Sequence, residues 1–242
     1  MESFQSPPHY RETAVPVANE GEVLLKVRAA ALSNLVRGQA NGSHYSSLNK
    51  FPFIPGNDGV GGTTEGRRVY LIAPRAPFGS MAEYTVVSQE KTILLPTHIE
   101  DAVAAALGNP GLATWGSLLG RAKLQRGEAV LVNGATGIAG KQAIQVARYL
   151  GASRIIATGR NEKVLRELTA LGATETISLN LPEDKLLQSF QAALHESGVQ
   201  VILDYLWGAS AEARLRFRLN RYVVPGWSCW AVVWAASLLK IF

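Results

Sequence analysis

Hydrophobic and polar residues alternate over the first 100 residues in a way that predicts short β-strands. The segment EVLLKVRAAA at residues 22–31 alternates and then turns to small residues. Further runs rich in strand-forming residues lie at 67–73, 82–87 and 91–95, and glycines and prolines separate them. This part of the chain therefore predicts an all-β unit with irregular loops.

From about residue 100 the pattern changes to an alternation of strands and helices. HIEDAVAAALGNPG predicts a short helix closed by Asn-Pro-Gly, and TWGSLLGRAKL predicts a second one. Three longer helices are then expected from apolar residues spaced three and four apart. They alternate with strands expected at 129–134, 154–158, 176–179 and 199–206. Such an alternation predicts a parallel sheet wound by right-handed crossovers, of which four strands are visible.

Residues 213–242 have neither this alternation nor its composition. Five of the 24 Lys and Arg residues and none of the 19 Asp and Glu residues lie there, so the rest of the chain is neutral and no nucleic-acid partner is expected. An uncharged run at 222–239 is at the lower limit for a membrane span, and Pro225 interrupts it. We favour two other interpretations over a membrane anchor. The segment is either an appendage that is amphipathic or prone to aggregation, or a stretch encoded in a shifted reading frame.

These patterns predict three regions: a β domain at 1–100, a partial dinucleotide-binding domain at 101–212 and an atypical basic and aromatic tail at 213–242. The only cysteine, Cys229, excludes an intramolecular disulfide and a multi-cysteine zinc site. A reducing compartment is the natural location for such a chain. Because the first residues also lack a signal-peptide pattern, we expect a cytoplasmic protein.

The stretch VNGATGIAG at 132–140 spaces three glycines between a predicted strand and a predicted helix. In a βαβ unit such glycines permit a tight turn, let backbone amides approach a phosphate and let the helix pack closely on the sheet. The pattern predicts a cradle for the pyrophosphate of a dinucleotide. Its residues are Gly134, Ala135, Thr136, Gly137, Ile138 and Ala139. The alternative is a tight turn that binds no ligand.

The end of the second strand of the predicted sheet indicates which dinucleotide would bind. Gly159, Arg160, Asn161 and Lys163 surround this point, and no acid stands directly at the strand end. An acid there would bind the ribose hydroxyl of NADH, whereas basic groups accommodate the 2′-phosphate of NADPH. We therefore expect NADPH. Two alternatives stay open: the basic pair is a solvated helix start, or Glu162 binds the ribose of NADH.

The sequence gives little support for a zinc site or a Ser-His-Asp triad. His9 and His44 have no paired ligand spacing for zinc, and no nucleophile-elbow motif supports a Ser-His-Asp triad. Tyr45, in the loop Gly-Ser-His-Tyr, is a candidate site residue. An ordinary surface tyrosine is an equally good interpretation of it.

Taken together, several stretches resemble a known family in the order that the family shows. They are GEVLLKVRAAALS (21–33), FPFIPGNDGVG (51–61), GRRVY (66–70), GSMAEYTVV (79–87), NPGLATW (109–115) and GEAVLVNGATGIAG (127–140). Over roughly residues 10–210 the chain is similar to the medium-chain dehydrogenase/reductase superfamily, in its zinc-independent quinone oxidoreductase-like branch. The resemblance implies a GroES-like β domain, a partial Rossmann domain and an enoyl-reductase type of activity.

The resemblance also implies a chemistry and a set of residues. The chemistry is NADPH-dependent transfer of hydride to a quinone, an enone or a similar activated double bond, without zinc. Ser33 and Asn57 stand where zinc-dependent relatives have ligands, and Ala113 replaces a frequent Thr. Tyr45 matches a tyrosine of the substrate cleft, and Asn109 matches the loop that faces the nicotinamide. Residues assigned to the cofactor are Gly134 to Ala139, Gly159, Arg160, Asn161, Lys163 and Tyr205, the last in the loop after the fourth strand.

The likeness fades after about residue 213, where family members continue the Rossmann sheet. We therefore also consider a truncated, non-catalytic relative that binds at most the adenosine half of NADPH. An incomplete sheet would expose an edge and apolar faces, which favours pairing with another chain, and a homo-oligomer is one form of this.

Overall fold

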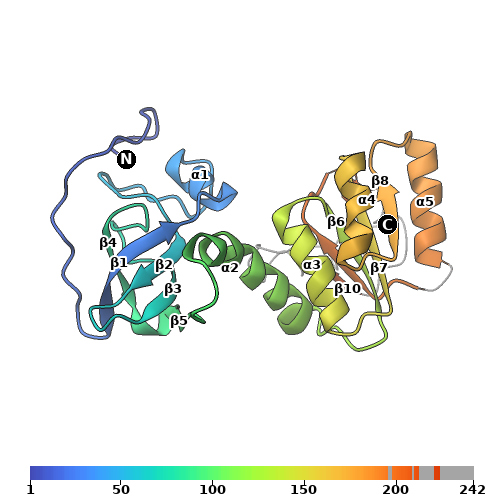
Figure 1. The fold of residues 1–242 in the computed structure, drawn as a ribbon. Helices are drawn as coiled ribbons and strands as arrows, with labels where there is room; N and C mark the ends of the chain where they lie inside the picture. The colour runs from blue at the N-terminus through green and yellow to red at the C-terminus, as the bar shows by residue number, and fades with distance from the viewer. Residues whose placement is uncertain (196–197, 209, 213–220, 224–242) are drawn as a thin grey trace. The chain divides into compact units, whose positions relative to one another are not determined.

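Two separate sheets organise the chain, each in its own compact unit (Figure 1). The computed structural model describes residues 1–195, 198–208, 210–212 and 221–223. The first unit is Met1–Asn109 and the second is Pro110–Phe242. The boundary therefore lies inside a helix, whereas the sequence analysis places it at residue 100.

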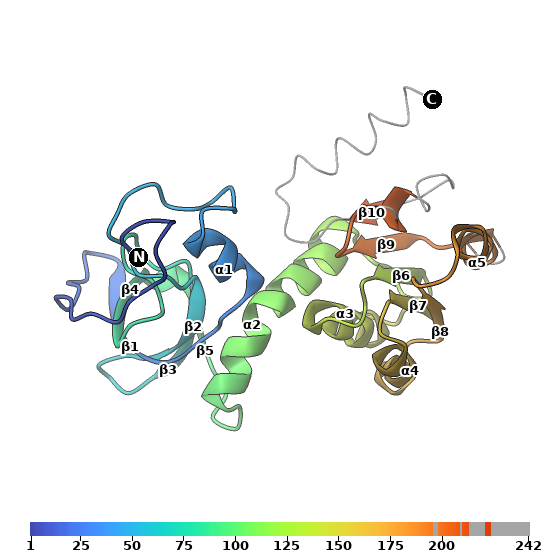
Figure 2. The same cartoon turned by 90° about the horizontal axis from the view of Figure 1, so that it is seen from above.

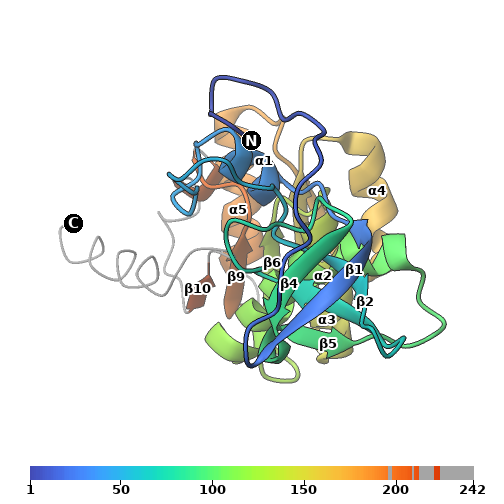
Figure 3. The same ribbon diagram turned by 90° about the vertical axis from the view of Figure 1, so that its left-hand side faces the viewer.

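The first unit contains a five-stranded antiparallel sheet in the order β4-β1-β2-β3-β5. Figure 3 shows its strands β1, β2, β4 and β5 from the side of the first unit. Its strands are β1 (Glu22–Ala30), β2 (Asp58–Gly62), β3 (Arg68–Ile72), β4 (Tyr84–Ser88) and β5 (Thr92–Leu94). β2 was not predicted, because its sequence, DGVGG, does not alternate between apolar and polar residues. A side chain at Gly59 would lie 2.5 Å from the carbonyl oxygen of Ala29, so close pairing with β1 requires this composition.

Ser33 begins the short helix α1 (Asn34–Ala40), where its hydroxyl accepts a hydrogen bond from the amide of Val36 at 3.3 Å. The residue that stands at a zinc-ligand position of related proteins is therefore a helix cap in this chain. The strands β4 and β5 are joined through the 3-10 turn η1 (Gln89–Lys91).

The helix predicted to end at Asn-Pro-Gly continues instead. Helix α2 (Asp101–Trp115) contains Pro110 and is followed directly by the π-helix η2 (Gly116–Arg121). Proline removes one backbone donor and disturbs the helix around it, but the chain can resume helical geometry on its far side. The expected break between two helices is therefore wrong.

The second unit contains a five-stranded parallel sheet in the order β10-β9-β6-β7-β8 (Figure 2). Its strands are β6 (Ala129–Asn133), β7 (Arg154–Gly159), β8 (Glu175–Ser178), β9 (Val201–Asp204) and β10 (Arg221–Val223), and its helices are α3 (Ile138–Tyr149), α4 (Glu162–Leu171) and α5 (Glu183–His195). The predicted alternation is confirmed from β6 to β9.

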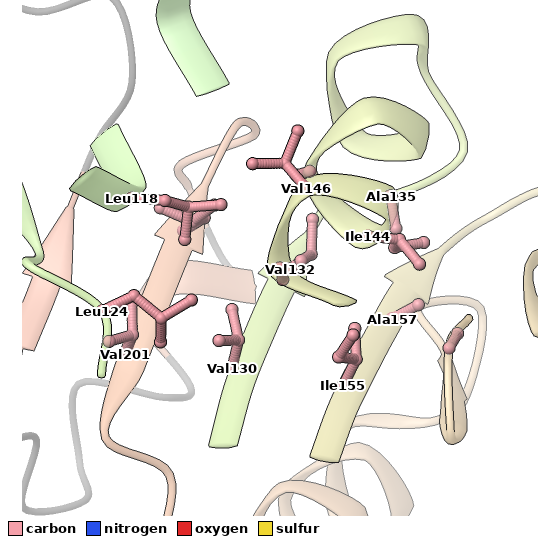
Figure 4. Close-up of a cluster of buried hydrophobic side chains, with 14 of the residues drawn as sticks. Leu118, Leu124, Val130, Val132, Ala135, Ile144, Val146, Ile155, Ala157 and Val201 are labelled. Atoms are coloured by element: carbon pink, nitrogen blue, oxygen red, sulfur yellow. The ribbon is translucent and has the colours of Figure 1, made fainter. Parts of the chain in front are cut away.

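Both faces of this sheet are buried, as the apolar strands require. Alternate residues of β6 face opposite sides: Val130 and Val132 pack in a cluster with α3 and α4 (Figure 4). Leu131 packs on the other side, where Phe190 of α5 is fully buried. The antiparallel sheet and the doubly wound parallel sheet together confirm the predicted GroES-like plus Rossmann architecture.

The expectation that the sheet ends at its fourth strand is wrong, because β10 pairs in parallel with β9. Arg221 donates to the carbonyl oxygens of Ala122 at 2.6 Å and Lys123 at 3.1 Å and forms an ion pair with Glu128. These contacts fix three residues of the predicted tail in the second unit. The other tail residues, including Cys229 and the 224–239 part of the run considered as a membrane span, lie outside the described residues.

Candidate functional site

The predicted cradle lies at the carboxyl end of β6, at the centre of the parallel sheet. Gly134 follows the strand with a φ of +85°, in the left-handed region that favours glycine. A side chain there would lie 2.7 Å from Cγ of Leu206. The next amide, of Ala135, donates to the carbonyl oxygen of Thr158 at 2.8 Å and ties the turn to β7.

The other two glycines act as the motif requires. Gly137 precedes α3 and provides no side-chain cap, and a side chain built there would have no neighbour nearer than 4.0 Å. The space beside Gly137 at the start of α3 is therefore open, as the binding of phosphate at a helix start requires. A side chain at Gly140 would lie 2.5 Å from Cα of Ala135, so this glycine permits the helix to approach the strand.

Thr136 and Ile138 lie on the rim of the cradle. A side chain at Gly159 would come within 2.4 Å of Cγ2 of Thr136, so the glycine that ends β7 leaves room for this threonine. Ile138 is 57% exposed although it is apolar. The carbonyl oxygen of Ala139 accepts a hydrogen bond from Thr114 at 3.4 Å.

A buried polar network connects the ends of three neighbouring strands beneath the cradle. Thr158 of β7 donates to Oδ1 of Asn133 in β6 at 2.6 Å. Nδ2 of Asn133 donates to Oδ1 of Asp204 in β9 at 2.7 Å and to Ser210 at 3.1 Å. Because buried polar groups are stable only when paired, these bonds hold the strand ends in register.

Asp204 also shapes the loop that follows β9. Its Oδ1 accepts from the backbone amides of Leu206 at 2.9 Å and Trp207 at 3.0 Å. Its Oδ2 accepts from the hydroxyl of Tyr222 in β10. The carboxylate thus fixes the loop whose Leu206 covers Gly134. From the sequence, only Tyr205 of this loop was assigned to the cofactor. Polar residues closing consecutive apolar strands were the signal that could have identified Asn133, Thr158 and Asp204.

Tyr205, predicted to bind the cofactor, is partly buried in this loop. Its amide donates to the carbonyl oxygen of Asn133 at 3.0 Å, and its hydroxyl lies 3.0 Å from Oγ1 of the fully buried Thr114. Burial raises the pKa of Tyr205, and the hydrogen bond with Thr114 opposes this in part. Ala113 lacks the hydroxyl that the resemblance leads us to expect, and Thr114 provides a hydroxyl one residue later.

The basic pair after β7 is exposed. Arg160 and Lys163 take part in no ion pair within the described part of the chain. Asn161 caps α4 by accepting from the amide of Val164 at 3.2 Å. Glu162, the residue that could favour NADH, accepts a hydrogen bond from Ser178. Two cations are therefore available here, while the carboxylate of Glu162 is hydrogen-bonded to Ser178.

The two predicted catalytic residues lie in the first unit and the cradle in the second. Tyr45 is 81% exposed, and its ring centroid lies 4.3 Å from that of His44. Asn109 is the last residue of the first unit and lies within α2. Both stay predicted site residues.

Asp58 is fully buried. It follows Asn57, which, like Ser33, stands where zinc-dependent relatives have a zinc ligand. Tyr70 donates to its Oδ2 at 2.8 Å, and among the described residues no donor reaches Oδ1. Burial raises the pKa of Asp58 above its ordinary 3.8, and the hydrogen bond from Tyr70 opposes this only in part. Burial and the neighbouring Asp58 raise the pKa of Tyr70 as well.

In residues 1–195, 198–208, 210–212 and 221–223, no three His, Cys, Asp or Glu side chains gather as a metal site would need. Over the same residues, the structure has no helix with both the length and the apolar character of a membrane span.

Comparisons with known proteins point to one group. The quinone oxidoreductase of Lama guanicoe is 31% identical over 206 residues, 81% of this chain and 60% of that protein. The NADPH-dependent alkenal/one oxidoreductase of Arabidopsis thaliana is 35% identical over 178 residues, 66% of this chain and 45% of that protein. The quinone oxidoreductase of Thermus thermophilus, solved alone and with NADPH, superposes with a TM-score of 0.76 and 27% identity, covering 99% of this chain and 82% of that one.

No protein-family profile matches the chain. The chain spans 60% of the length of the curated quinone oxidoreductases that it resembles. Sequence similarity to these proteins, the shared two-sheet fold and the glycine cradle agree. The chain belongs to the medium-chain dehydrogenase/reductase superfamily, in its quinone oxidoreductase-like branch.

Proposed function

We propose that this chain is an NADPH-dependent, zinc-independent oxidoreductase that reduces a quinone, an enone or a similar activated double bond. The observation that carries the proposal is the cradle at Gly134 to Ala139, with its left-handed first glycine and its open helix start. These features serve an anion that approaches the backbone closely.

The residues around the cradle fit NADPH. Backbone amides at Gly137 and Ile138 would hold the pyrophosphate, and Arg160 with Lys163 would hold the 2′-phosphate. Gly159 leaves no carboxylate at the end of β7 to repel that phosphate. The names of the relatives agree with this choice, since one is called NADPH-dependent and another was solved with NADPH.

The chemistry that NADPH supplies is a hydride, which adds to the electron-poor carbon of the acceptor. Hydride addition would leave negative charge on the acceptor's oxygen, and a proton from solvent would complete the two-electron reduction. Because Ser33 caps a helix and Asn57 is an amide, we assign the stabilisation of this charge to hydrogen-bond donors. Tyr45 and Asn109 are the proposed donors and positioning groups of the first unit.

Turnover by the full chain tests the proposal. We expect NADPH to be consumed with 1,2-naphthoquinone or simple enones, and NADH to be a poorer donor. Arg160→Met should weaken NADPH binding by about ten-fold, the scale of one lost charged contact, and leave NADH binding unchanged. Arg166→Met, an exposed arginine of α4 beyond the first turn, is the matched control.

The outcomes separate the alternatives. No turnover with any acceptor, together with no NADPH binding, would overturn the proposal. Binding of NADPH without turnover would support the non-catalytic alternative. A cytoplasmic location and a homo-oligomeric state remain predictions, which fractionation of cells and the measured mass of the purified chain would test.

A further inference from the structure

Helix α2 packs closely on the antiparallel sheet of the first unit, because the residues that it turns toward the sheet are small. Ala104 and Ala105 are buried in one cluster with Val60 of β2. A side chain at Gly108 would lie 2.2 Å from Cε2 of Tyr70 in β3 and 2.6 Å from its hydroxyl oxygen, closer than non-bonded atoms approach. The backbone of α2 therefore rests directly on the phenol of Tyr70.

The phenol is itself held in place by Asp58. The hydroxyl of Tyr70 donates to Oδ2 of Asp58 at 2.8 Å, and both residues are buried. The carbonyl oxygen of Asp58 accepts from the hydroxyl of Ser80 at 2.7 Å, which fixes the backbone behind the carboxylate. Oδ1, in contrast, has no donor in the part of the chain that the structure describes. Such a buried acid is costly, so its presence calls for a reason other than stability.

Asn109 directly follows Gly108 and is a proposed donor to the acceptor's oxygen. Helix α2 is weakened at this point, because Pro110 has no amide hydrogen to donate to the carbonyl oxygen of Ala106. The hydrogen bonds of the helix therefore fix Asn109 less firmly than a residue in an uninterrupted helix. The contact with Tyr70, one residue earlier, provides a second support at the same place.

We propose that Tyr70, held by Asp58, is a positioning residue for Asn109: it sets the depth at which α2 places this donor. The inference rests on the proposed function, in which Asn109 stabilises the charge that hydride addition leaves on the acceptor. A hydrogen-bond donor stabilises such a charge best when it is held in position before the reaction. A displacement of about 1 Å can lower the rate by about 100-fold.

The test uses the full chain with Gly108→Ala and Tyr70→Phe, and with Gly116→Ala as the matched control. Gly116 begins η2, directly after α2, and a side chain there would have no neighbour within 4 Å. Each variant is also made in an Asn109→Ala background. We would measure kcat and KM for 1,2-naphthoquinone, and the dissociation constant of NADPH.

Gly108→Ala forces the helix and the phenol apart, so we expect kcat to fall by about 10- to 100-fold. The acceptor KM and the NADPH dissociation constant should change by less than about two-fold, because the charge concerned appears only as hydride is transferred. Tyr70→Phe keeps the ring but frees it from Asp58, and should lower kcat by roughly three-fold. Gly116→Ala should match wild type.

The Asn109→Ala background separates positioning from a purely structural role. There, Gly108→Ala and Tyr70→Phe should have little further effect on kcat, because the group that the phenol positions is gone. Loss of folded protein, in contrast, would lower activity equally in both backgrounds. Tyr70→Phe gives the same test where the alanine variant folds poorly.

Unchanged kcat in both Gly108→Ala and Tyr70→Phe would overturn the inference, and so would equal losses of kcat with and without Asn109. A higher acceptor KM at unchanged kcat would assign the phenol to acceptor binding instead. If Asn109→Ala itself kept the wild-type kcat, the role of Asn109 in the proposed function would fail. A wild-type chain that turned over no acceptor would remove that function altogether, an outcome distinct from the others.

Discussion

Asp58 in the first unit and Asp204 in the second are both buried carboxylates, 0% and 1% exposed, yet their surroundings differ. Asp204 accepts from Asn133, from two backbone amides of its own loop and from Tyr222. For Asp58 the described residues provide one side-chain donor, Tyr70, and none for Oδ1. Both carboxylates lose their hydrating water on burial. The number of hydrogen-bond donors around each carboxylate therefore decides how much of that hydration is replaced.

This difference separates two uses of a buried acid. The donors of Asp204 come from β6, from the loop after β9 and from β10, so one carboxylate joins three segments under the cradle. The carboxylate of Asp58 joins only two neighbouring strands, β2 and β3. Because one hydrogen bond replaces only part of the hydration that the carboxylate loses on burial, its pKa is raised. The comparison predicts that changes at Asp204 alter both stability and cofactor binding, and that changes at Asp58 alter mainly the pH dependence of stability.

The largest effect is expected for Asp204→Ala. The substitution leaves several buried donors without an acceptor, so the free energy of unfolding should fall by about 3–5 kcal/mol. Chemical denaturation measures this, and NADPH binding should be lost with the loop. Asp204→Asn, which retains one oxygen, should lose less. A fall below about 1 kcal/mol in the alanine variant would contradict the role assigned to Asp204.

The sequence predicted the cradle because its determinants are local. Glycine spacing, a strand before it and a helix after it are all visible within residues 129–150. The pairing of the polar side chains around it was not predictable, because the partners are far apart in the sequence: 71 residues separate Asn133 from Asp204, and 91 separate Thr114 from Tyr205. Only the fold brings such pairs together.

Two strands, β2 and β10, were not predicted from the sequence, each for a different reason. β2 is rich in glycine, which weakens any strand pattern, and only its close contact with β1 explains it. β10 is three residues long, too short for a periodic signal. The anchoring contacts of Arg221 and Tyr222 are with residues far earlier in the chain.

Tyr70→Phe should have the second largest effect. The ring is retained, and with it the close contact to Gly108, where an added side chain would lie 2.2 Å from the ring. Asp58 loses its side-chain donor, however, and we expect the free energy of unfolding to fall by about 2 kcal/mol at neutral pH. The same denaturation measurement at acidic pH should show a smaller loss. An equal loss at both pH values would argue against the hydrogen bond as the cause.

Tyr222→Phe is the matched change on the other side of the comparison. It removes one of several donors to Asp204, and the rest of the network stays in place. We expect a loss of about 1 kcal/mol, smaller than for Tyr70→Phe, and little change with pH. A loss greater than that of Tyr70→Phe would mean that the number of remaining donors does not decide the cost.

The smallest change in stability is expected for Asp58→Asn, but its pH dependence is the most specific. A raised pKa means that the folded chain holds the proton of Asp58 more tightly than the unfolded chain. The stability gained in this way is present below the ordinary pKa of 3.8 and is lost as the pH rises through the folded-state pKa. Tyr70 stays protonated over this range, because its ordinary pKa of 10.0 already lies above it and burial raises that pKa further.

Asparagine has no proton to lose, so the variant should lack this decline. At acidic pH the two proteins should differ by no more than about 0.5 kcal/mol. As the pH rises from about 4 to 8, wild type should lose stability relative to the variant, as read from urea unfolding at each pH. Asp204→Asn provides the contrast. The hydrogen bonds to Asp204 already replace the hydration that its carboxylate loses on burial, so this substitution should be destabilising over the whole pH range. Parallel curves for wild type and Asp58→Asn would show that Asp58 does not take up a proton on folding, and the proposed distinction between the two buried acids would then fail.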